Sequence, residues 1–356
     1  MGSNPTPGIS AGVTDAFSEA ETLVDEFGPR PPGSDAERRA AKHLAARLEA
    51  LGREVETESF AVWPAWAGGN AINAAVAIVG SVVAVSSATL GTVLVLLATI
   101  LTFLDLAGIA PTTRRLLGRR ASQNVVSWGD REKEGAVLLV AHYDSGPART
   151  RPLRPMFIAL LVLLLCCVLR AGGMEGTALT VVQFIPTVVL IVYIALLLDI
   201  VLSPAVPGEN DNASGVGVVL RLAERLDGLE YFGVHVLFTG SQKAMAHGMR
   251  AFLKAHRKEL PDDTVVLNLD AVGGGEVRLT KKEGPLLTVG SNSQLTEAVD
   301  VETVVNREPS DGYAAASSRL AAVTITGTAD RLEEDTLSEA EETCVEIVEA
   351  LDEELS

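Results

Sequence analysis

The chain has 356 residues, 47% of them hydrophobic, and its mean hydropathy is +0.27. This composition is too apolar for an ordinary soluble protein and indicates membrane-spanning segments. The formal net charge of −17 argues against nucleic acid or an anionic lipid as the main partner, because both are themselves negatively charged.

The cysteines and the N-terminal segment argue against a disulfide-rich or cysteine-zinc protein and against a cleaved signal peptide. The three cysteines lie in apolar or helical patterns, so we expect neither a disulfide framework nor a cysteine-based zinc site. The first residues contain no basic start followed by an apolar core, so we expect no cleaved signal peptide.

Helical and strand patterns alternate along the chain outside its most apolar parts. Ser34 and Glu37 form a capping box that predicts a helix ending near Gly52, and residues 212–226 have a second helical pattern. A further capping box, from Ser338 to Glu341, predicts the start of a final helix. Strands are expected at 124–128, 136–145, 234–240, 264–273 and 321–327. This alternation predicts an α/β domain with a mostly parallel central sheet.

Two long apolar tracts interrupt the α/β pattern. The first, at about 71–110, has no charged residue from Ala74 to Leu104, and is too long for one straight crossing of about 20 residues. The second, at about 155–203, is broken at Arg170–Gly176. Each tract is therefore predicted to form a hairpin of two transmembrane helices. The alternative, buried helices of a soluble core, rarely has such length without charge.

The segments around the tracts are expected to form one domain on one side of the membrane. The domain would comprise 1–70, 111–154 and 204–356, with transmembrane hairpins at 71–110 and 155–203. Arginines flank the crossings on the domain side, and only Arg170 lies on the other. They are Arg114, Arg115, Arg119, Arg120, Arg149, Arg151 and Arg154. Because basic residues favour the cytoplasmic side, we predict an integral protein of the cell membrane with its domain and both termini in the cytoplasm.

Polar residues follow several of the predicted strands. His142 ends one strand and Asp270 another, and Asp211 comes just before a predicted helix. Ligands of parallel sheets bind beyond the carboxyl ends of the strands, so these three side chains could converge there. One imidazole and two carboxylates suit a zinc ion, and Asp144 could accept a hydrogen bond from the other imidazole nitrogen.

Six stretches around these residues resemble the M28 metallopeptidases. They are FGPRPPGSDAERRAAKHLAARLEALG, LLVAHYDS, GENDNASGVGVVLRLAERL, LFTG, NLDAVG and SDGYAAASSRLAAVTITG, in that order. The resemblance covers nearly all of the chain outside the apolar tracts. It implies the phosphorylase/hydrolase-like α/β fold of a group of zinc aminopeptidases and carboxypeptidases.

The resemblance also implies two zinc ions bridged by an aspartate, which matches Asp211. His142 and Asp270 match the further ligands of one ion. The glutamate and the distant histidine of the other ion are replaced by Lys243 and Gly312, and the general-base glutamate is replaced by Gln242. One metal site thus keeps its ligands, and the second keeps one of three.

These replacements predict a degenerate site. A glutamine side chain cannot take a proton from metal-bound water, and we expect the Lys243 ammonium to replace the missing ion and pair with Asp211. The alternative is a solvated helix lysine. The predicted function is a membrane-anchored pseudopeptidase that binds a peptide, a protein partner or one metal ion without efficient hydrolysis.

Two other functions remain open at this level. One is a hydrolase that uses a single zinc ion at His142, Asp211 and Asp270. The other is a structural platform for membrane assembly, with an empty cleft. The expected cofactor is one zinc ion or none, and the expected partners are the lipid bilayer, through four helices, and an unnamed peptide or protein.

Overall fold

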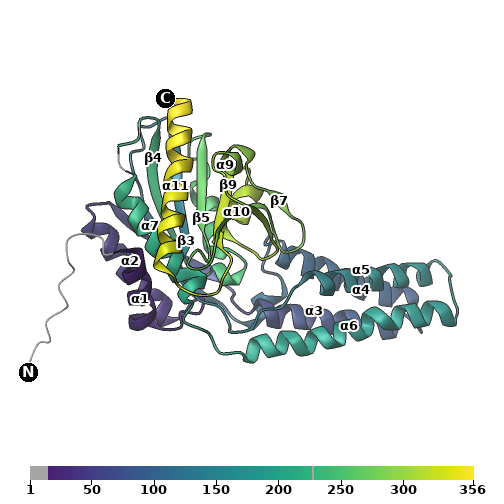
Figure 1. Cartoon of the computed structure of the whole chain (residues 1–356). Helices are drawn as coiled ribbons and strands as arrows, with labels where there is room; N and C mark the ends of the chain where they lie inside the picture. The colour runs from purple at the N-terminus through teal and green to yellow at the C-terminus, as the bar shows by residue number, and fades with distance from the viewer. Residues whose placement is uncertain (1–14, 227) are drawn as a thin grey trace, which may run out of the picture.

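The computed structural model describes residues 15–226 and 228–356. An α/β domain occupies one end of the molecule, and four long helices project from it side by side (Figure 1). The domain is assembled from segments before, between and after the two helical hairpins, so the chain enters and leaves it repeatedly.

One mixed sheet forms the centre of the domain. Among the described residues it has nine strands in the order β1-β2-β4-β3-β5-β9-β6-β7, with β8 beside β6. The strands are β1 (Val55–Val62), β2 (Arg120–Ser127), β3 (Gly135–His142), β4 (Phe232–Thr239), β5 (Thr264–Leu269), β6 (Val277–Glu283), β7 (Val289–Gly290), β8 (Thr303–Asn306) and β9 (Ala321–Gly327).

The expectation of a mostly parallel sheet is wrong. The four central strands, β4, β3, β5 and β9, are parallel, but β2 pairs antiparallel with both β1 and β4, and β6 pairs antiparallel with β9 and β7. Every residue of β3, β4 and β5 is buried, which explains why their sequences are continuous apolar runs. Strands β1 and β6 carry polar residues instead, and their pattern does not identify them as strands.

Helices cover both faces of the sheet. Helices α1 (Ala16–Phe27), α2 (Asp35–Ala50), α7 (Ser214–Arg225) and α11 (Glu334–Leu355) pack on one face. Helices α8 (His247–His256) and α10 (Asp311–Ser317) pack on the other. The remaining domain elements are short: η1 (Thr113–Leu117), η2 (Glu209–Ala213), η3 (Gln242–Ala244) and α9 (Ser293–Glu297).

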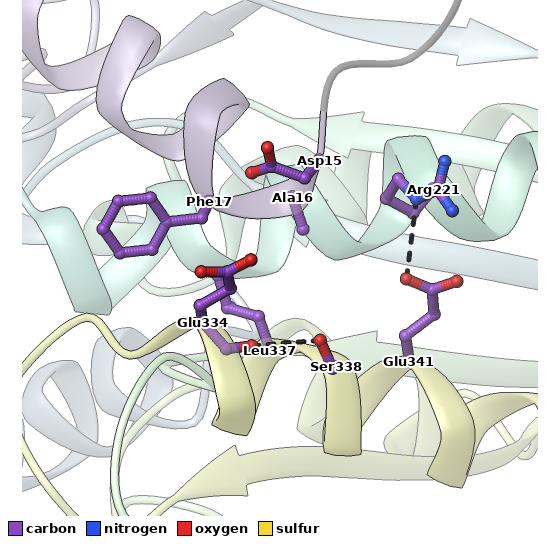
Figure 2. A pocket seen from close by; sticks show the side chains of 8 residues that line it. All are labelled: Asp15, Ala16, Phe17, Arg221, Glu334, Leu337, Ser338 and Glu341. Carbon is purple, nitrogen blue, oxygen red and sulfur yellow. Dashed lines mark hydrogen bonds and ion pairs between the residues drawn. The ribbon is translucent and has the colours of Figure 1, made fainter.

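The two capping predictions have different outcomes. The Ser34 hydroxyl accepts the Glu37 N–H at 3.1 Å, so α2 begins where the sequence predicted. The final helix does not begin at Ser338: α11 starts four residues earlier, and the Ser338 hydroxyl donates to the Glu334 carbonyl oxygen within the helix (Figure 2). Packing of α11 against α1 and α7 extends the helix beyond its local capping signal.

The two apolar tracts form the projecting bundle. Helices α3 (Trp66–Val83) and α4 (Ala88–Leu106) make the first hairpin, and α5 (Arg154–Ala171) and α6 (Thr177–Leu202) make the second. All four are long and apolar enough to cross a membrane. Alanines face the bundle interior together with large residues such as Leu163 and Leu190, and other large apolar side chains such as Val82, Leu165 and Phe184 are exposed. Exposed apolar side chains of this kind suit helices that are surrounded by lipid.

Gly91 allows α4 to approach the end of α3 closely in the first hairpin, and a larger residue at this position should destabilise the protein. A Cβ atom at Gly91 would lie 2.4 Å from the Cβ atom of Ala84. We expect Gly91→Ala to lower the unfolding free energy in detergent by about 1–3 kcal/mol, because the added carbon overpacks the contact. Thermal unfolding measures the change. Gly172→Ala is the matched control, since its nearest contact would be 3.4 Å; equal melting of both variants would contradict the packing argument.

Candidate functional site

Three strand-end or loop segments bring His142, Asp211 and Asp270 together. His142 is the last residue of β3, Asp270 follows β5, and Asp211 lies in η2 just before α7. One potential ligand atom from each residue lies within 4.8 Å of the others. The carboxyl ends of neighbouring parallel strands explain this convergence.

The imidazole of His142 is held at both nitrogens. Nδ1 lies 3.0 Å from the Asp144 carbonyl oxygen and 3.4 Å from the Asp144 carboxylate, and Nε2 lies 3.0 Å from the Asp211 carbonyl oxygen. Burial and Lys243 lower the pKa of His142, but hydrogen bonds with Asp144 and Asp270 outweigh them and raise it to about 10. Two carbonyl acceptors require two N–H donors, so this arrangement suits the imidazolium form.

The Asp144 carboxylate holds the turn that carries Gln242 and Lys243. Its two oxygens accept the main-chain N–H groups of Gln242 and Lys243, at 2.8 and 2.9 Å. The turn is unusual in its backbone, because Ser241, Met245 and Ala246 all have positive φ angles. Such conformations persist only where surrounding contacts impose them.

Glu37 and Arg114 supply two of those contacts. Glu37 accepts the Ser241 N–H at 2.9 Å, and Arg114 donates to the Ala244 carbonyl oxygen at 3.0 Å. Arg114 also forms a buried ion pair, at 2.7 Å, with Asp105 of α4. Met245 packs into the apolar core of the helical bundle. The turn is therefore fixed from the domain on one side and from the bundle on the other.

Lys243 forms an ion pair with Asp211. The distance from Lys243 Nζ to Asp211 Oδ1 is 2.6 Å, and the side chains are 19% and 34% exposed. Burial alone would lower the pKa of Lys243, but the charges of Asp211 and Asp270 raise it above its ordinary value. Burial would raise the pKa of Asp211, but Lys243 and His142 hold it below its ordinary value. Both partners are therefore charged at neutral pH.

Gln242 and Gly312 offer neither a carboxylate nor an imidazole at the two positions where the resemblance implies a general base and a metal ligand. The Gln242 amide donates to the Pro309 carbonyl oxygen at 3.0 Å and lies 3.4 Å from Asp270 Oδ2. At Gly312 a Cβ atom would lie 2.2 Å from Thr324 Oγ1. A histidine at this position would need its neighbours to move before it could reach a metal ion.

A cavity of about 730 Å³ opens beside these residues, between the domain and the bundle. Asp211, Gln242 and Lys243 line one part of it, and residues at the domain ends of α3 and α5 line another. Glu308, which no sequence pattern singles out, also lines the cavity, and its charge helps to raise the pKa of Lys243. A smaller hollow, of about 340 Å³, lies between α1, α7 and α11, away from this site (Figure 2).

Arg30, fully buried, was also missed as a site residue. Its guanidinium donates to the Tyr143 carbonyl oxygen, the Asn212 amide oxygen and the Pro207 carbonyl oxygen. These bonds tie the loop after His142 to the loop around Asp211. Arg30 lies in the stretch FGPRPPGSD, which contributes to the resemblance to the M28 family. That stretch does not by itself predict that Arg30 joins the two loops.

Comparison with known families identifies the domain. The model of peptidase family M28 matches residues 124–311, which is more than half of the chain. This chain belongs to peptidase family M28. No curated protein sequence matches the chain.

Solved structures share the fold of this M28 protein at low sequence identity. A leucine aminopeptidase precursor from Bacteroides thetaiotaomicron is 16% identical, with 96% of this chain and 99% of that chain covered and a TM-score of 0.52. BSAP, a zinc aminopeptidase from Bacillus subtilis, is 12% identical, with 94% of each chain covered and a TM-score of 0.55. A glutaminyl cyclase from B. thetaiotaomicron is 15% identical, with coverages of 97% and 99% and a TM-score of 0.53.

The donor set can be compared with the zinc that this family implies. His142, Asp211 and Asp270 offer one nitrogen and two carboxylates within reach of a single ion. A second ion does not fit, because an ammonium group stands at Asp211 and no ligand remains at positions 243 and 312. Loading even the first ion requires the imidazole to lose its Nε2 proton.

The buried carboxyl group of Asp311 predicts a pH dependence of stability. It is buried, and Thr239 donates to one of its oxygens while the other has no partner in the described part of the chain. Burial raises the pKa of Asp311 to about 7. Because the folded protein then holds this proton more tightly than the unfolded chain, stability should fall as pH rises from about 4 to about 7.

Asp311→Asn should flatten that part of the stability profile and make the protein relatively more stable above pH 7. Thermal midpoints in detergent across the pH range measure this. A variant profile parallel to that of the unmodified protein would contradict the assignment.

Proposed function

We propose that this M28 protein is a membrane-anchored pseudopeptidase whose cleft binds a peptide or protein segment without hydrolysing it efficiently. The observation that carries the proposal is the ion pair of Lys243 with Asp211, at 2.6 Å. It places a fixed positive charge against the carboxylate that would bridge two metal ions, and the neighbouring base position holds an amide.

The side chains of the cleft suit binding better than catalysis. Lys243 can donate to a carbonyl or carboxylate of a bound peptide, and Asp270 and Glu308 can pair with the amino group of that peptide. Gln242 orients Asp270 and cannot take a proton from water. A cavity of about 730 Å³ with these groups on its wall favours a ligand over a purely structural platform.

A hydrolase with a single zinc ion is the second candidate, favoured by the clustering of His142, Asp211 and Asp270 within 4.8 Å. A zinc ion bound there would activate water as a nucleophile near neutral pH. In this candidate, Lys243 would leave Asp211 when the ion binds. Glu308 is then an acid on the cavity wall that could receive a proton.

Zinc binding to the Lys243→Met variant tests the central ion pair. Removing the ammonium should tighten zinc binding by roughly tenfold or more, since a unit charge at this distance contributes on the order of 1–4 kcal/mol. Titration calorimetry with zinc alone measures the change. Lys281→Met, at an exposed lysine of β6, is the matched control, and His142→Ala should abolish binding. Two equivalents of zinc tightly bound to the unmodified protein would overturn the ligand argument.

Turnover separates the two candidates. The unmodified protein should hydrolyse a panel of amino-acyl reporter substrates no faster than background, with or without zinc, because catalytic parts that act together do not contribute singly. Robust turnover that a chelator removes and Asp211→Asn abolishes would replace the pseudopeptidase proposal with the single-zinc hydrolase.

We also propose that the four apolar helices cross the cell membrane and that the domain lies in the cytoplasm. The arginines at the domain ends of the helices support this orientation, because the opposite ends have only Arg170. Asp199, the acid nearest the domain end of α6, is neutralised by Arg149 and Arg151.

Cysteine labelling tests the topology in a variant without its native cysteines. Ser356→Cys, at the end of α11, should react with an impermeant thiol reagent only after the cells are opened. Gly173→Cys, between α5 and α6, should react in intact cells. Labelling at position 356 from outside intact cells would reject the proposed orientation.

A further inference from the structure

The segment after α4 combines exposed arginines with exposed leucines. All residues from Arg115 to Arg120 are exposed. Leu116 is 80% exposed and Leu117 is 45% exposed. This combination is unfavourable in water, because apolar side chains gain free energy only when they are covered.

The arginines of this segment lack acidic partners. Among the described residues, Arg115, Arg119 and Arg120 form no ion pair, although Arg115 lies over the ring of Trp63, 5.2 Å from its centroid. The sequence contains no acidic residue between Asp105 and Asp130. In a chain of net charge −17, Arg115–Arg120 is therefore a local run of positive charge.

Contacts of Leu117 place the segment at the level where the bundle meets the domain. A Cβ atom at Gly68, in the first turn of α3, would lie 2.9 Å from Leu117 Cδ1 and 4.0 Å from Val201 Cγ2, at the end of α6. Beside the segment, a shallow hollow of about 470 Å³ is lined by the end of β1 and by Arg119 and Arg120. Both features lie where a bilayer around the helices would have its headgroups.

We propose that Arg115–Arg120 is a docking surface for anionic phospholipids. Leu116 and Leu117 enter the boundary between headgroups and acyl chains, and the three unpaired arginines bind lipid phosphates. The exposed leucines favour a lipid over a free phosphate ion, which offers nothing to cover them. The inference rests on the proposed membrane insertion, and it adds a lipid preference that the net charge of the chain argues against.

Lipid retention by the full chain provides the test. The protein is reconstituted in nanodiscs of mixed phosphatidylcholine and phosphatidylglycerol, extracted in mild detergent, and its bound lipids are counted by native mass spectrometry. We expect phosphatidylglycerol to be enriched over the mixture. The variant Arg115→Gln, Arg119→Gln and Arg120→Gln should lose the enrichment, since each arginine near a membrane surface is worth roughly fivefold in affinity.

Three controls decide the cause of a loss. Lysine at the same three positions should keep most of the enrichment, because the charges remain. Leu116→Ser with Leu117→Ser should weaken retention with the arginines intact. Arg131→Gln, Lys254→Gln and Lys258→Gln remove the same charge near the opposite end of β2 and should change nothing.

Three outcomes would overturn the proposal. They are unchanged enrichment in the arginine variant, an equal loss in the distant control, and displacement of the lipid by inorganic phosphate but not by sodium chloride of equal ionic strength. Alkaline extraction of the cell membranes tests the insertion separately: a chain released into the soluble fraction would refute membrane insertion itself, whatever lipids it carries.

Discussion

The ion pair between Lys243 and Asp211 determines how the rest of the site is arranged. Three carboxylates, Asp144, Asp211 and Asp270, converge at the carboxyl edge of the sheet, and their mutual repulsion must be offset. In this chain a fixed ammonium and an imidazolium supply the positive charge. These positive charges offset the repulsion among the converged carboxylates, and the fold of the family surrounds a site that has an amide at position 242 and an ammonium group at position 243.

The turn that presents Lys243 is costly to maintain. Its positive φ angles at Ser241, Met245 and Ala246 are imposed by hydrogen bonds from groups distant in the sequence, above all Asp144 and Glu37. Burial and, to a smaller extent, the nearby Asp144 raise the pKa of Glu37 to about 8, so the turn rests on a second group whose protonation differs from that of an exposed acid. This strain and this shifted protonation accompany a turn whose side chains at positions 242 and 243 are an amide and an ammonium group.

Sequence patterns predicted the parts of this structure that depend on local chemistry. The continuous apolar runs of β3 and β5 identified strands, and the length of the tracts identified two helical hairpins. Patterns failed where pairing between distant segments decides the outcome: β1, with its sequence VETESFAV, becomes a strand only because β2 lies beside it. Likewise, the Ser338 pattern predicted a helix start that tertiary packing moved to Glu334.

The candidate site divides in the same way. The candidate site residues at positions 142, 211, 242, 243, 270 and 312 could be named from the sequence. In the structure the first five lie close together, and three of them, at positions 211, 242 and 243, also line the cavity. The roles of Arg30 and Glu308 could not be read, because a buried hydrogen-bonding arginine and a cavity-wall acid have no local pattern. Nor could the sequence show that Gly312 is closely packed against Thr324.

The Arg114–Asp105 pair carries a practical consequence for anyone who wishes to study the domain in isolation. Excising the first hairpin would leave an unpaired arginine beneath the turn and expose Met245, which belongs to the core of the helical bundle. A soluble fragment would therefore lack part of the floor of its own cleft. The cleft and the four-helix bundle are joined by these contacts, so ligand binding is best measured on a chain that keeps both.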